Sequence, residues 1–197
     1  MNEPRDIVRP FQKLIGQLAD PDPATREAAA ASLYREGASL CASAAQEWMK
    51  DSEFRALARS GQCVVGIAVQ PQTFEAIRAA NASPRLAGVP PDQDAKEFEL
   101  DIGGGHFDIL TTRELGGAGA IARYLQKFGE GIQQIEIDVS DVDRATEILR
   151  ARFGIEPVYP ATRPGADGTR VNFFLAPAQG KKALIELVEA PKKKHEK

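Results

Sequence analysis

Residues 61–190 carry the same order of secondary-structure signals twice, at a spacing of roughly 75 residues. Each copy begins with an apolar strand pattern, continues with a helix pattern and ends in further strand patterns. VVGIAV at 64–69 aligns with QIEIDV at 134–139, and HFDILTT at 106–112 aligns with ALIELVE at 183–189. The repeat predicts an α+β fold in which two βαβββ modules form a curved sheet around a cleft. We expect module one at 61–115, a linker helix at 117–128 and module two at 130–190.

The individual elements follow from periodicity and turn residues. In module one we expect a helix at 71–81 and strands at 62–70, 97–102 and 106–112. In module two we expect a helix at 141–154 and strands at 132–139, 157–161, 170–176 and 182–189. The stretch RPGADG at 163–168 is expected to be a turn. Gly103-Gly104-Gly105 lies between two strands, and glycine supplies the positive φ that tight hairpins need. A phosphate-binding loop opens a helix. Because a strand follows here, the glycines predict a hairpin.

Residues 1–60 show helix patterns rather than strand patterns and predict a small all-α segment. Asp22 is a good N-cap and Pro23 a good first helical residue, and Gly37 is expected to end that helix. Further helices are expected at 40–49 and 53–58. The domain organisation is therefore a helical segment at 1–60, a sheet domain at 61–190 and a basic tail at 191–197.

Composition narrows the classes of partner. A formal net charge of −3 gives no reason to expect nucleic-acid binding, and the run KKKHEK at 192–197 is typical of a solvated terminus. No stretch approaches the roughly 18 apolar residues of a membrane span. Cys41 and Cys63 fit neither a disulfide framework nor a zinc spacing. They predict reduced thiols in a cytoplasmic protein.

The helical segment resembles a HEAT repeat. The likeness rests on Leu14, Leu18, Asp20-Pro21-Asp22-Pro23, Arg26, Ala29, Leu33 and Gly37. A single repeat cannot bury its own apolar face, and solenoids need several. Two alternatives stay open: a helical cap packed on the following domain, or a docking surface for a protein partner.

The sheet domain resembles the vicinal oxygen chelate superfamily, which includes glyoxalase I, bleomycin-resistance proteins and extradiol dioxygenases, and is most similar to the methylmalonyl-CoA epimerases. The likeness rests on the stretch 117–155 and on GTRVNFFLAP and GKKALIELVE, and extends more weakly back to Gln62. The resemblance implies paired βαβββ modules around a divalent metal. It also implies a histidine on the first strand of each module and Gln or Glu on the last strand as ligands.

Carried onto this sequence, the four ligand positions fall on Val64, Asp108, Gln134 and Glu186. Only Glu186 keeps the family's residue type, and oxygen donors favour Mg²⁺, Ca²⁺ or Mn²⁺. His106 shares a strand face with Asp108 because residues two apart point the same way. The expected metal ligands are therefore Asp108, Gln134, Glu186 and His106, with Glu186 as the catalytic proton carrier. The alternative is a degenerate site whose polar groups bond one another or water.

Three functions remain in competition. The first is a protein that binds a small organic molecule in its cleft, as a divergent metal-assisted epimerase, isomerase or lyase acting next to a carbonyl. The second is metal-free small-molecule binding of the resistance type, and the third is a protein-interaction module with a degenerate site. Arg163 and Arg170 flank a predicted turn near the cleft mouth and are either anion-binding or solvated. A homodimer is implied by the resemblance, and a protein partner would use the N-terminal helices.

Overall fold

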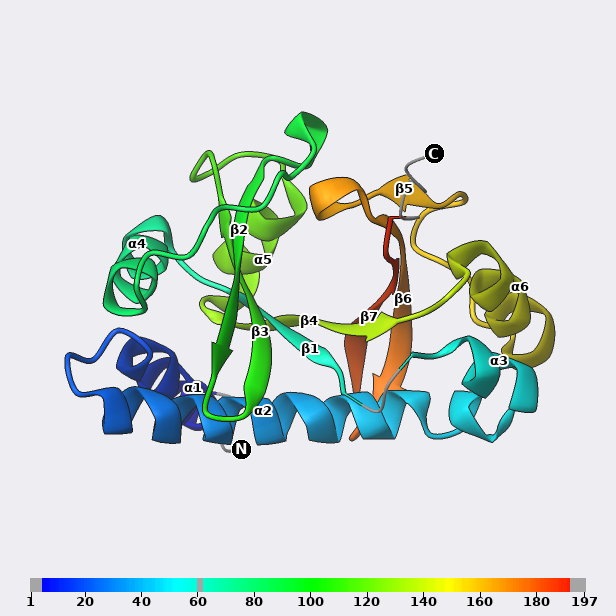
Figure 1. The fold of residues 1–197 in the computed structure, drawn as a ribbon, viewed down its shortest axis with the longest axis horizontal. Helices are drawn as coiled ribbons and strands as arrows, with labels where there is room; N and C mark the ends of the chain where they lie inside the picture. The colour runs from blue at the N-terminus through cyan, green and yellow to red at the C-terminus, as the bar shows by residue number, and fades with distance from the viewer. Residues whose placement is uncertain (1–4, 60–61, 192–197) are drawn as a thin grey trace, which may run out of the picture. The chain divides into compact units, whose positions relative to one another are not determined.

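The computed structural model describes residues 5–59 and 62–191, and its residues group into two compact units (Figure 1). Unit one takes the chain up to Ser39 together with Val64–Gln133. Unit two takes Leu40–Cys63 together with the chain from Gln134 onward. Each unit thus combines part of the helical N-terminal region with one module. The predicted α+β class is confirmed, and the basic tail at 192–197 lies outside the described residues.

Unit one contains a three-stranded sheet in the order β2-β3-β1. Its elements are α1 (Arg5–Gln17), the larger part of α2 (Pro23–Ala45), β1 (Val64–Ala68), α4 (Pro71–Ala80), β2 (Ala95–Ile102), β3 (Gly105–Thr112) and α5 (Ala120–Phe128). β2 pairs antiparallel with β3, and β1 pairs parallel with β3. Buried apolar side chains fill its core, among them Phe74 of α4, Phe98 of β2 and Ile109 of β3.

The hairpin between β2 and β3 turns at Gly103 and Gly104, whose φ angles are +59° and +75°. The predicted glycine hairpin is therefore confirmed. Among its described residues, from 62 onward, module one has three strands rather than the four of a βαβββ unit. In the segment before β2, Ala87 N donates to Glu97 O on that strand at 2.9 Å, but the segment does not form a strand of its own.

Unit two contains a four-stranded sheet in the order β4-β7-β6-β5. Its elements are η1 (Trp48–Lys50), α3 (Ser52–Leu57), most of β4 (Gly131–Asp138), α6 (Val142–Phe153), β5 (Arg163–Pro164), η3 (Ala166–Gly168), β6 (Arg170–Ala178) and β7 (Lys181–Glu189). β4 is parallel to β7, and β5, β6 and β7 run antiparallel to their neighbours. Asp141 caps α6, since its carboxylate accepts from Arg144 N at 2.9 Å.

The predicted strand at 157–161 is wrong. Pro157 makes only an isolated bridge to Phe174, and the short strand β5 lies instead inside the predicted turn. Proline has no N–H to donate to a sheet ladder, so the two prolines at 157 and 160 disfavour a regular strand there.

The expected end of a helix at Gly37 is also wrong, because α2 runs unbroken over 23 residues to Ala45. Gly37 instead allows close packing: a Cβ at this position would lie 2.4 Å from Val65 Cγ2 on β1. The separate helix expected at 40–49 is therefore absent, while the expected short helix after it is α3. One long helix with these contacts gives no support to the HEAT resemblance.

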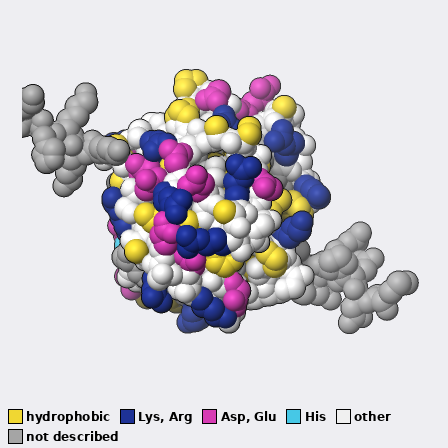
Figure 2. Space-filling view, turned by 90° about the vertical axis from the view of Figure 1, so that its right-hand side faces the viewer, with side chains coloured by type: hydrophobic (Ala, Val, Ile, Leu, Met, Phe, Trp, Pro, Cys, Tyr) yellow, Lys and Arg dark blue, Asp and Glu magenta, His cyan; other side chains and the backbone are white. Residues whose placement is uncertain are grey.

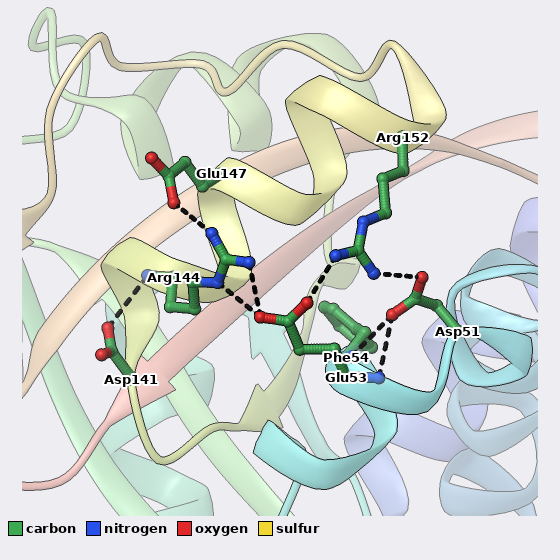
Figure 3. Close-up of polar contacts among 7 residues, drawn as sticks. All are labelled: Asp51, Glu53, Phe54, Asp141, Arg144, Glu147 and Arg152. Carbon is green, nitrogen blue, oxygen red and sulfur yellow. Dashed lines mark hydrogen bonds and ion pairs between the residues drawn. The ribbon is translucent and has the colours of Figure 1, made fainter.

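In unit two, α3 packs against η1 through a buried aromatic pair and is joined to α6 by a charged surface network. The Phe54 ring is fully buried and meets Trp48 edge-to-face, with centroids 5.8 Å apart. Arg144 and Arg152 on α6 bind the Glu53 carboxylate from two sides (Figure 3). Figure 2 faces the side on which α3 and α6 lie in Figure 1, and it shows basic and acidic side chains interspersed there.

The chain after α3 is also tied to the end of β4 in unit two by backbone hydrogen bonds. Arg59 N donates to Asp138 O, and Ser140 N donates to Leu57 O, both at 2.8 Å. None of the described helices is both long enough and apolar enough to span a bilayer.

Candidate functional site

The sheet of unit two has two faces, and strand register assigns each side chain to one of them. α6 contacts β6 and β7, and Asn172 on β6 donates to Thr146 of α6 at 3.4 Å. Asn172 therefore marks the helix face. Because successive residues alternate, Phe173 lies on the opposite face, together with its cross-strand partner Glu186. We call this opposite face the site face.

Two polar side chains on the site face bond directly to each other. Gln134 of β4 donates from Nε2 to Oε2 of Glu186 on the neighbouring strand β7. Both side chains are buried, at 9% and 7% exposure. A buried carboxylate needs hydrogen-bond donors to offset its lost hydration, and the Gln134 amide provides one. The structure thus brings together two of the four expected site residues.

An aromatic and basic group extends the site face toward β5. The rings of Phe173 and Tyr159 pack edge-to-face, with centroids 5.9 Å apart and an interplanar angle of 75°. Val158 N donates to Phe173 O at 2.7 Å, which fixes the loop that carries Tyr159. The Arg163 guanidinium carbon then lies 4.5 Å from the centre of the Tyr159 ring. Sequence analysis missed Phe173 and Tyr159; the alternation of RVNFFLA was the only signal for the former.

The other two expected residues lie on β3 in unit one. Asp108 is buried at 6% exposure, between Gly66 of β1 and Glu99 of β2 in register. His106 lies at the start of β3, and its Nδ1 is 2.5 Å from Asp101 Oδ1, the cross-strand neighbour. His106 is thus engaged in a half-exposed pair at the end of the hairpin.

The donors present do not fit a metal centre within either unit. No three His, Cys, Asp or Glu side chains among residues 5–59 and 62–191 are placed to hold an ion. Val64 offers no donor, the Gln134 amide is bonded to Glu186, and His106 is bonded to Asp101. Ligation by Asp108, Gln134, Glu186 and His106 stays a prediction.

A hollow with a volume of about 660 Å³ lies on the helix face of unit two, beside α6 and the start of β6. Arg170 at its rim binds Glu189 at 2.9 Å and Asp143 at 2.5 Å. The hydroxyl of Thr162 and the Arg170 guanidinium hold the pKa of the Asp143 carboxyl below its usual range. Arg170 is therefore part of an ion-pair network on the face away from Glu186.

The comparisons with known proteins find matches among solved structures. No protein-family model and no curated protein sequence matches the chain. Among solved structures, methylmalonyl-CoA epimerase from Mycobacterium tuberculosis is 33% identical with a TM-score of 0.52; the match covers 66% of this chain and 87% of the epimerase.

Two further structures are complexes of the same type of enzyme. A methylmalonyl-CoA epimerase bound to methylmalonyl-CoA and NH4+ is 27% identical with a TM-score of 0.55, covering 69% of this chain and 96% of its own. A Streptomyces coelicolor epimerase variant bound to 2-nitronate-propionyl-CoA is 27% identical with a TM-score of 0.52, covering 64% and 94%. With a strand–helix–strand order that occurs twice and one-third identity over most of an epimerase, the chain belongs to the vicinal oxygen chelate superfamily, as a structural relative of the methylmalonyl-CoA epimerases.

Proposed function

We propose that this chain binds a small acyl thioester on the site face of unit two, with Glu186 beside the reactive carbon, and that binding needs no metal. The observation that carries the proposal is the buried Gln134–Glu186 pair. The ligand class is supported by the neighbours, which are seen with methylmalonyl-CoA and with 2-nitronate-propionyl-CoA.

The chemistry of the pair favours recognition over strong base catalysis. The carbon next to a thioester carbonyl is weakly acidic, and a carboxylate is a suitable acceptor for its proton. The amide of Gln134 donates to the Glu186 carboxylate and stabilises its charged form. We therefore propose ligand binding as the principal function and slow proton exchange at this carbon as a secondary activity.

Calorimetry with methylmalonyl-CoA tests the principal proposal. The wild-type chain should bind one molecule per chain. Glu186→Ala should weaken binding about tenfold or more, because the buried Gln134 amide loses its acceptor and the pair no longer holds the site in shape. Glu147→Gln, on the exposed surface of α6, is the matched control and should bind like the wild type. Equal binding by Glu186→Ala and the wild type would contradict the assignment.

Proton exchange needs its own experiment. Deuterium incorporation next to the thioester carbonyl of methylmalonyl-CoA, followed by NMR in D2O, should occur with the wild type and stop with Glu186→Gln. Exchange that continues unchanged in Glu186→Gln would remove Glu186 from the chemistry and leave binding as the function.

We also propose that the chain self-associates and that its domains end near residues 60 and 190. Self-association is tested by light scattering, and the domain limits at residues 60 and 190 by limited proteolysis. A protein partner on the N-terminal helices and a cytoplasmic location, based on Cys41 and Cys63, are further predictions.

A further inference from the structure

We infer that Cys41 and Cys63 form an oxidation site in unit two, where a hydroperoxide converts their thiols into a reversible disulfide that fastens the η1–α3 segment to the rest of the unit. Both cysteines belong to unit two, and both carry reduced thiols in this structure. Because the sequence contains only two cysteines, a disulfide within one chain must join these two. The site does not depend on the function proposed above.

The packing of α2 on β1 places the two cysteines opposite each other. A Cβ at Gly37 would lie 2.4 Å from Val65 Cγ2, so the glycine lets the helix come close to the strand at this point. Cys41 follows Gly37 by four residues, which is about 6 Å along the same face of α2. Cys63 precedes Val65 by two residues, which is about 7 Å along the same side of an extended chain. Similar steps along helix and strand therefore lead from the Gly37–Val65 contact to Cys41 and Cys63.

The two thiols are joined by a hydrogen bond. This bond to the Cys63 thiol, together with burial, raises the pKa of the Cys41 thiol above its usual range. A protonated thiol is a poor nucleophile, so the pair stays reduced until an oxidant is present and then reacts over seconds to hours. Because the sulfur atoms already lie within hydrogen-bonding reach, the disulfide forms after a small local movement.

Exposure determines the order of the two chemical steps. Cys63 is buried at 6% exposure, whereas Cys41 is only half-buried, so hydrogen peroxide reaches Cys41 first. The Cys41 sulfur, as its thiolate, attacks the peroxide; the O–O bond breaks, and a sulfenic acid and one water form after proton transfer. The Cys63 sulfur then attacks the Cys41 sulfur and displaces its oxygen, which leaves with the Cys63 proton as a second water. Two electrons thus pass from the two sulfurs to one peroxide, and a small dithiol reverses the disulfide by exchange.

The disulfide closes a loop over residues 42–62, which contains η1 and α3. In the reduced protein this segment is held by non-covalent contacts, among them the buried Phe54 ring, the ion pairs of Glu53 and the hydrogen bond from Arg59 N to Asp138 O. A cross-link between the two ends of the segment restricts the unfolded chain and so favours the folded state. The oxidised protein should therefore melt about 5–10 °C above the reduced protein.

The test exposes the reduced, folded protein to hydrogen peroxide. Intact-mass spectrometry and non-reducing peptide mapping should show chains that have lost two hydrogens and are not linked to one another, with the peptides of Cys41 and Cys63 joined. Dithiothreitol should restore the starting mass and remove the rise in Tm. Cys41→Ser and Cys63→Ser should form no disulfide within the chain and should show no rise in Tm after the same treatment.

The matched control is the double variant Cys41→Ser/Ser43→Cys, which keeps two cysteines but moves one of them to another face of α2. The Ser43 side chain points elsewhere in unit two, since its Oγ accepts a hydrogen bond from Gln179 N at 3.1 Å. Cysteines whose side chains point apart cannot be bridged without backbone movement, so this variant should remain a dithiol.

Three results would overturn the inference. They are sulfenic or sulfinic acid at Cys41 without a disulfide, a disulfide that forms as readily in the double variant as in the wild type, and a disulfide that leaves the Tm unchanged. Thermal melting of each reduced variant before treatment establishes that it is folded. If Cys63→Ser does not fold, Cys41→Ser and the double variant still decide the outcome.

Discussion

Gly37→Ala tests the packing of α2 on β1. Alanine favours helix formation, yet at this position its Cβ should destabilise the protein. An alanine Cβ would lie 2.4 Å from Val65 Cγ2 and 2.8 Å from Val65 Cγ1, distances that real contacts do not reach. Val65 is fully buried on β1, so its side chain has little room to move. Such overpacking costs about 1–3 kcal/mol, and the helix propensity gained by alanine returns at most about 1 kcal/mol.

The expected net loss is about 1–2 kcal/mol, equivalent to a fall in Tm of about 2–8 °C for a chain of this size. Gly16→Ala is the matched control, because Gly16 lies in α1 with no atom within 4 Å of the added Cβ. It should leave the Tm unchanged or raise it slightly. In the double variant Gly37→Ala/Val65→Ala, the two losses of stability should not add, because the smaller side chain at 65 leaves room for the alanine Cβ at 37. A Gly37→Ala protein as stable as the Gly16→Ala protein would refute the packing account.

Three further predictions concern the hairpin, the core and the surface network. Gly103→Ala should lower the free energy of unfolding, measured by urea denaturation, by at least about 1 kcal/mol more than Gly104→Ala does. The φ angle is positive at both positions, but only a Cβ at 103 would meet the α2 backbone, 2.5 Å from Glu27 O. Phe54→Ala should cost about 3–5 kcal/mol in the same assay, since its ring is fully buried. The hydrogen bond from Arg144 holds the pKa of the Glu53 carboxyl below its usual range. The stability from Glu53 is therefore present above its unfolded pKa of about 4.3 and is lost as the pH falls further. Arg144→Met should flatten this part of the Tm–pH curve, and an unchanged curve would contradict the pairing.

Repetition and turn chemistry made the fold predictable from sequence. The two strand–helix–strand patterns have the correct period, and the glycines at 103–105 predict the hairpin because positive φ is a local property of the backbone. Asp22 and Asp141 predict helix starts for the same reason, since a cap satisfies backbone N–H groups within its own turn.

Features that depend on tertiary contact were not predictable. Gly37 looks like a helix terminator, yet its lack of a side chain serves the approach of Val65, which is distant in sequence. The bond between Gln134 and Glu186 joins two residues that are 52 positions apart in the sequence, so no local pattern points to it. The support of Arg163 by Tyr159 likewise requires the loop that folds back over β6.

Methylmalonyl-CoA binding to protein treated with EDTA tests the central claim most directly. We predict saturable heat with one molecule bound per chain, unchanged when Mg²⁺, Mn²⁺, Co²⁺ or Ni²⁺ is restored and strongly reduced in Glu186→Ala. Binding that is absent after EDTA and returns only with a metal would contradict the account, and would mean that the site gains from an ion the affinity here assigned to Gln134 and Glu186.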